Sequence, residues 1–333
     1  MTSALTWGAD QVTCANDGTT IRGKFETLSK TTVVIKQSSD ETTTISPDDI
    51  IEIRFDREPP PLQAARSNER SGSYKAAIEQ LQKVLSEYTG RDKRVLTEIE
   101  FLVARCQARL ALADPDVTQT ALTSLQSFLQ QNGNSYRTLE AMLLQAQLLI
   151  GTDRSQATRL LEQLRSSGVD GFAIQAGVVL GRALLGEAKP DQAKEVFDDV
   201  IRNSHGKATA LGAHYESRIG RAECLLMQDQ LKQALTELKV VIAEIPNDQH
   251  ATLAKAWLHT GHGHRQSDQP QAALLAYLHV DILYPDATAE HAEALYQLTS
   301  LWEAAGYPER ARATQSRLLT QYPDSQWAAQ NKE

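Results

Sequence analysis

The sequence predicts a mainly α-helical protein of 333 residues, in which a small five-stranded β-barrel precedes an α-solenoid of about seven helical hairpins. Three observations predict this class. Aromatic residues make up only 6% of the chain, which favours helices packed through small side chains. Apolar residues alternate with a period of two as far as Asp56, and from Leu62 onward their period is helical. In the helical part, an alanine-centred pattern recurs seven times.

Charge and hydropathy argue against several classes of function. The chain has 34 basic and 42 acidic residues, a formal net charge of −8, whereas nucleic-acid binders normally carry a basic face. No apolar run reaches eighteen residues, so no membrane span is expected. The cysteines, Cys14, Cys106 and Cys224, are sparse and far apart, which fits neither a disulfide framework nor a zinc site.

Residues 1–9 are expected to be a disordered start or the remnant of an export signal. Met1 precedes neither a charged region nor a long apolar run, and this predicts a cytoplasmic protein. However, the run of mostly small residues from Ser3 to Ala9 is typical of the tail of an export signal, which would place the protein in the periplasm. The sequence leaves the compartment open.

Residues 10–57 are expected to form the barrel. Apolar and polar side chains alternate, as around Val12 and Cys14, and Thr, Val and Ile are frequent, which suits short strands. Asn16-Asp17-Gly18 predicts a hairpin turn because glycine tolerates a positive φ. Pro47-Asp48-Asp49 predicts a one-turn connector before the last strand. The five strands are expected near residues 11–14, 21–25, 33–35, 42–45 and 51–55.

This segment resembles the Sm-like, SH3-type barrels through the run from Ala15 to Gly23 and through Ile51-Glu52-Ile53-Arg54. Family members that bind RNA carry Asp and Asn in the loop after the second strand and glycine after the final arginine. Here that loop runs from Leu28 to Thr32, and Phe55 follows Arg54. Residues 1–56 hold five basic and nine acidic side chains, which disfavours phosphate binding. We expect the barrel to contact protein, and RNA binding is the alternative.

Residues 58–62, with three consecutive prolines, predict an extended linker before a repeat array over residues 63–333. In each repeat, residues four and seven positions after an alanine are in most cases large and apolar, which places all three on one helical face. Prolines three residues ahead of the alanine open the helix in three repeats. The anchor alanines are Ala77, Ala121, Ala157, Ala193, Ala234, Ala273 and Ala311.

This pattern resembles the tetratricopeptide repeat (TPR). The sixth unit matches best, with Trp257, Gly261, Ala273, Tyr277 and Pro285 at the family's spacing, whereas the first three units lack the closing proline. The resemblance implies stacked helical hairpins and a non-catalytic scaffold that binds a peptide or helix on its concave face. The tail, residues 322–328, resembles the ends of repeat proteins in bacterial envelope assemblies.

The repeat register projects seven side chains onto the concave face, where we expect them to contact a protein or peptide partner: Arg182, Glu216, Glu223, Lys255, His262, Arg265 and Tyr296. No catalytic motif, cofactor or metal site is expected. His259, His262 and His264 are close in sequence, but a helix turns His264 about 140° away from His259. The sequence leaves the partner's identity and the oligomeric state open.

Overall fold

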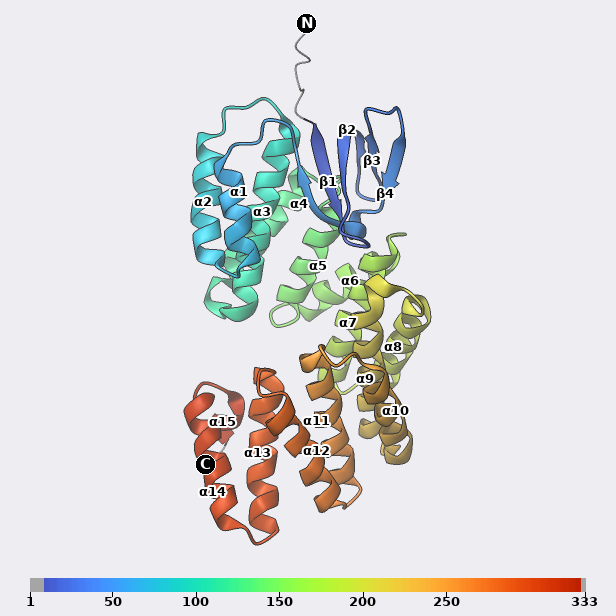
Figure 1. Cartoon of the computed structure of the whole chain (residues 1–333), viewed down its shortest axis with the longest axis vertical. Helices are drawn as coiled ribbons and strands as arrows, with labels where there is room; N and C mark the ends of the chain where they lie inside the picture. The colour runs from blue at the N-terminus through green and yellow to red at the C-terminus, as the bar shows by residue number, and fades with distance from the viewer. Residues whose placement is uncertain (1–8, 331–333) are drawn as a thin grey trace, which may run out of the picture. The chain divides into compact units, whose positions relative to one another are not determined.

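The computed structural model describes residues 9–330 (Figure 1). The chain divides into unit 1, which ends at Val179, and unit 2, which begins at Leu180. Apart from Ala9, the start segment predicted as disordered or as a signal remnant lies outside the described residues. Within residues 9–330, no helix combines the length and the apolar character that crossing a membrane requires.

Unit 1 begins with a five-stranded antiparallel sheet whose strand order is β4-β3-β2-β1-β5. The ladders between the described residues leave β4 and β5 at the two edges. Gly23 lies where β2 and β3 approach most closely, since a Cβ there would be 2.2 Å from the Lys36 carbonyl oxygen. The strands are β1 (Asp10–Cys14), β2 (Thr20–Leu28), β3 (Val33–Lys36), β4 (Thr42–Ile45) and β5 (Ile50–Arg54), and the connector Pro47–Asp49 is a 3₁₀ turn.

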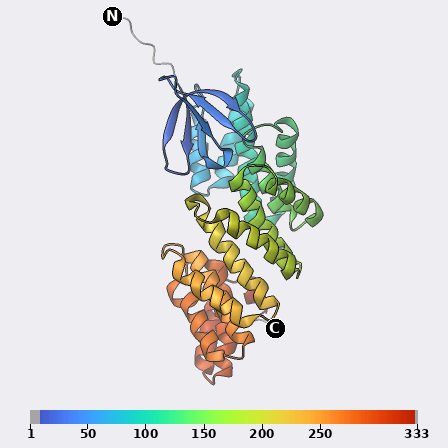
Figure 2. The ribbon, with the colours of Figure 1, turned by 90° about the vertical axis from the view of Figure 1, so that its right-hand side faces the viewer.

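The sheet shares one hydrophobic core with the first helices of unit 1, and both views show it beside them (Figures 1 and 2). Val12 and Ile53 from the sheet belong to the same buried cluster as Leu62 and Ala65 from α1 (Pro61–Arg70). The extended linker predicted over residues 58–62 is shorter than expected, because Pro61 already opens α1. The first turn of a helix suits proline, which has no N–H group.

Polar contacts, among them those of Arg66 and Asp48, also join the sheet and its connector to the helices of the same unit. The Arg66 guanidinium on α1 donates to the Ile53 carbonyl at 2.8 Å. Asp48, in the connector, accepts a hydrogen bond from the backbone N–H of Gly171 at 2.6 Å, in the first turn of α7. A carboxylate at this place satisfies a helix N-terminal donor.

Within residues 9–330, fourteen helices follow one another as seven helical hairpins, and the short α15 comes after them. The second helices are α2 (Tyr74–Glu87), α4 (Thr118–Gln131), α6 (Arg154–Arg165), α8 (Pro190–Ser204), α10 (Leu231–Glu244), α12 (Pro270–Leu283) and α14 (Pro308–Gln321). Besides α1, the first helices are α3 (Lys93–Ala113), α5 (Thr138–Leu149), α7 (Asp170–Gly186), α9 (Leu211–Met227), α11 (His250–Gln266) and α13 (Thr288–Ala304), and α15 is Gln326–Gln330.

The structure confirms the predicted repeat register. All seven anchor alanines lie on the second helix of a hairpin, and none is more than 6% exposed. Close crossings of helices explain the small residues on the first helices. A Cβ on Gly181 or Gly220 would lie 2.4 Å from the Phe197 ring, and a Cβ on Gly261 would lie 2.4 Å from the Tyr277 ring. Large rings thus fill the space that glycine leaves open.

A buried ion network joins the first helices of unit 1. Arg105 forms two hydrogen bonds with Glu69, at 2.6 and 2.8 Å, and a third with Glu140 at 3.2 Å. Arg137 links Glu140, at 3.0 Å, to Glu98, at 2.9 Å. Burial disfavours the Glu98 carboxylate, but Arg137 outweighs this and lowers its pKa to about 2. The five charged side chains of this network therefore have partners inside unit 1.

Candidate partner-binding site

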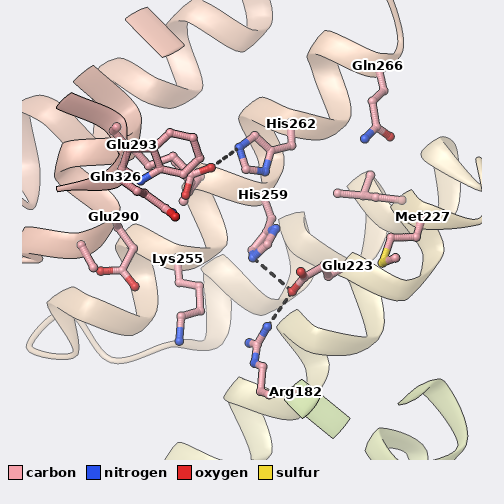
Figure 3. Close-up of a pocket in the computed structure, with 14 residues that line it drawn as sticks. Arg182, Glu223, Met227, Lys255, His259, His262, Gln266, Glu290, Glu293 and Gln326 are labelled. Atoms are coloured by element: carbon pink, nitrogen blue, oxygen red, sulfur yellow. Dashed lines mark hydrogen bonds and ion pairs between the residues drawn. The ribbon is translucent and has the colours of Figure 1, made fainter. Parts of the chain in front are cut away.

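The first helices of unit 2 line a hollow of about 530 Å³ (Figure 3). Charged side chains line it together with the apolar side chains of Leu226, Met227 and Leu258. The polar and charged residues that define it come from α7 (Arg182), α9 (Glu223), α11 (Lys255, His259, His262, Gln266), α13 (Glu290, Glu293) and α15 (Gln326).

Helical spacing explains why α11 contributes most to the hollow. Lys255, His259, His262 and Gln266 follow one another at intervals of four, three and four residues, which places them on one face of the helix. Figure 3 shows these side chains along α11, with the two histidines between Glu223 and Glu293. A single stripe of α11 therefore faces the hollow.

An ion chain connects three first helices at one end of the hollow. Arg182 contacts Glu223 at 2.6 Å and Glu216 at 3.2 Å, while the Lys255 ammonium contacts both oxygens of Glu216 at 3.0 Å. Burial raises the pKa of Glu216, but Lys255 and Arg182 outweigh burial and hold the pKa below its usual value. Both cations of the hollow therefore have carboxylate partners within unit 2.

The two histidines of the hollow differ in their surroundings. His259 lies 3.5 Å from Glu223, and its ring meets the His262 ring edge to face at 5.5 Å. Burial, with smaller effects from His262, Arg182 and Lys255, lowers the pKa of His259 well below its ordinary value, so this imidazole is neutral at pH 7. His262 lies 3.1 Å from Glu293.

The third histidine of the sequence cluster, His264, faces away from the hollow and contacts the Gln269 side chain at 2.8 Å. Its side chain is partly exposed. Across residues 9–330, no set of three His, Cys, Asp or Glu side chains is arranged to hold a metal ion.

Five of the seven residues expected on the concave face lie at the hollow or in its ion chain: Arg182, Glu216, Glu223, Lys255 and His262. The other two lie elsewhere. Arg265 bonds to the Gln297 amide oxygen on α13 and does not line the hollow. Tyr296 contributes only indirectly, because its ring packs at 5.2 Å on Trp327, which does line the hollow.

Sequence reasoning missed His259, Glu290, Glu293 and Trp327. The signal for His259 was present, since it lies four residues after Lys255 and three before His262 on one helical face. Trp327 follows the last hairpin on α15, outside the repeat register, so no repeat position identified it. Among the described residues, the Glu290 carboxylate has no ionic or hydrogen-bonding partner.

Comparison with known proteins identifies the fold of the helical part. No family model matches the sequence, and no curated protein matches it. A tetratricopeptide repeat protein from Parabacteroides merdae ATCC 43184 aligns with a TM-score of 0.61 and 14% identity, over 81% of this chain and 95% of that one. The apo form of the quorum sensor NprR from B. thuringiensis aligns with a TM-score of 0.62 and 12% identity, over 78% and 74%.

A third solved structure is similar in the same way. A Rap protein complexed with Competence and Sporulation Factor aligns with a TM-score of 0.57 and 12% identity, over 81% of this chain and 79% of that one. At such identities the likeness extends to the fold alone. The helical hairpins of this chain form a TPR-like solenoid.

Proposed function

We propose that the protein is a non-catalytic interaction scaffold that binds a peptide or helix of a protein partner on the concave face of its solenoid. One observation carries the proposal: consecutive first helices of unit 2 share an open hollow that is lined by both charged and apolar side chains. Such a surface suits a segment with both polar and apolar groups. The Rap protein, solved in complex with Competence and Sporulation Factor, supports the proposal by the likeness of its fold.

The charges of the hollow favour a partner segment that carries a lysine or arginine. Arg182 and Lys255 already have carboxylate partners, whereas Glu290 has none among the described residues. Glu293 forms an ion-pair contact with the His262 imidazole, at 3.1 Å. Trp327 lines the same hollow, and an indole face attracts a cation by about 0.5–2 kcal/mol. A lysine or arginine of the partner could therefore pair with the Glu290 carboxylate and pack on the Trp327 indole.

A random-peptide display library panned against the immobilised full chain tests the proposal. We expect enriched peptides to contain a basic residue and to bind Glu290→Lys about tenfold more weakly, or worse, because one attraction becomes a repulsion. Glu303→Lys is the matched control, since Glu303 lies on the same helix, is exposed and does not line the hollow. Failure to enrich any peptide, or equal binding by wild type and Glu290→Lys, would refute the proposed site.

We also propose that the N-terminal sheet is an Sm-like, SH3-type barrel that docks on the helices and does not bind RNA. Support comes from its strand order, from the 3₁₀ turn between β4 and β5, and from the core that it shares with α1 and α3. RNA binding is the alternative role. Retention of the full chain on single-stranded RNA at low salt, lost as salt rises, would favour that alternative.

A further inference from the structure

A second hollow of unit 2 lies on the opposite side of α11. Its α11 residues, Trp257, Thr260 and His264, are turned about 180° from the stripe that faces the first hollow. Leu235 and Ile242 from α10 are among the side chains that make its surface mainly apolar, and its volume is about 690 Å³. We call this hollow the outer groove.

An exposed apolar stripe on α12 adjoins the outer groove. Leu275, Ile282 and Leu283 are 59%, 67% and 52% exposed, so three of the most exposed large apolar side chains in the described chain lie on one helix. With His279 they follow helical spacing on one face. The His279 ring stacks on Trp257 at 4.0 Å with an interplanar angle of 11°, which links the stripe to the groove floor. Contiguous exposed apolar surface of this kind marks interaction sites.

The charge of the outer groove is opposite to that of the chain. Lys232 and Lys239 line it from α10, and among the described residues neither ammonium has a carboxylate partner. Within residues 9–330, no aspartate or glutamate lines the groove, although the chain as a whole carries a formal charge of −8. The two lysines are seven residues apart, so they lie on one face of α10 about 10.5 Å apart along its axis. An occupant that complements the groove is therefore acidic as well as apolar.

We propose that the outer groove binds an acidic amphipathic helix of a protein partner. Its apolar face would cover Leu235, Trp257 and Leu275, and carboxylates about two helical turns apart would meet Lys232 and Lys239. A helix suits the site because apolar anchors at intervals of three and four residues fit an elongated apolar groove. The site is separate from the first hollow, since it uses the other face of α11.

Two synthetic helical peptides serve as probes, one with glutamates and one with lysines flanking the same leucine face. Fluorescence anisotropy with the full chain should show the acidic peptide binding at least about tenfold more tightly than the basic one. The double variant K232E/K239E should reverse this preference, and Leu275→Ser should weaken both peptides. Lys83→Glu, at an exposed position on α2, should leave acidic-peptide binding unchanged.

Circular dichroism melts of each variant establish that it is folded before its binding is compared. Equal binding of the two peptides, or the same preference in K232E/K239E, overturns the proposal. Two further results also overturn it by assigning the surface another occupant. One is binding to anionic phosphatidylglycerol vesicles in place of the peptide. The other is concentration-dependent dimerisation in sedimentation that Leu275→Ser abolishes.

Discussion

The replacement Gly261→Ala tests the close helix crossing at the centre of the sixth hairpin. The new Cβ would lie 2.4 Å from Cε1 and 2.6 Å from Cζ of Tyr277. The ring is fully buried in a cluster with Leu258 and Val280, so it has little room to move. Overpacking of a core costs about 1–3 kcal/mol, while alanine gains up to about 1 kcal/mol over glycine in a helix. We expect a net loss of about 1 kcal/mol in the free energy of unfolding.

Gly212→Ala is the matched control, because Gly212 lies on α9 of the same unit and an added Cβ there would have no neighbour within 4 Å. It should leave stability unchanged or raise it by up to about 1 kcal/mol. The difference between the two variants, about 1–3 kcal/mol, then isolates the contact with Tyr277. Urea unfolding followed by circular dichroism measures both. If Gly261→Ala stabilises the protein as much as Gly212→Ala does, the reasoning about the crossing is wrong.

Three further predictions concern the packing and the charges of both units. Ala273→Leu should destabilise by about 1–3 kcal/mol, because Ala273 is fully buried, whereas the half-buried Ala272→Leu should be nearly neutral in the same urea titration. The pKa of Glu98 is about 2 in the folded protein and 4.5 in the unfolded chain, so the ionised carboxylate stabilises the fold at pH values above 4.5. This stabilisation, about 3 kcal/mol, is lost as the pH falls from 4.5 towards 2. When the free energy of unfolding is measured against pH, Glu98→Gln should therefore lose less stability over that range than the wild type. An equal loss in both proteins would contradict the lowered pKa of Glu98. Asp48→Ala should lower the melting temperature by removing the acceptor of the Gly171 N–H, at a cost of about 0.5–2 kcal/mol, and an unchanged melt would show that this cap is dispensable.

The repeat architecture was predictable because its signals are local and periodic. Each anchor alanine is one point in a pattern of three small or apolar residues on one helical face, and seven copies reinforce one another. Gly261 and Tyr277 show the physical basis, since the glycine is required where the ring passes. The strands were predictable for a similar reason, because the alternation along β1 reflects one buried face. Along β5 the alternation is broken, since Ile50 and Ile53 are buried whereas Ile51 is 53% exposed.

Contacts between distant segments were not predictable from the pattern. Glu69 and Arg105 are 36 residues apart, and a single sequence carries no periodic mark that pairs them. Both side chains are largely buried once α1 and α3 pack together. The three prolines at residues 59–61 predicted an extended spacer, but burial of Leu62 in the core shared with the sheet favours helix from Pro61 onward. Tertiary packing thus decided both outcomes.

The candidate site was predictable in part. The repeat register located Arg182, Glu223, Lys255 and His262 on neighbouring first helices, and the structure places all four around one hollow. The register says nothing about residues beyond the last hairpin, so Trp327 was missed.

Hydrogen–deuterium exchange on the full chain, with and without a peptide enriched by panning, tests the central claim most directly. The account predicts that protection on binding is confined to the first helices of unit 2, strongest in α11 and α13, which contribute most of the hollow. Protection confined to the N-terminal sheet or to α12, with α11 and α13 unchanged, would contradict it.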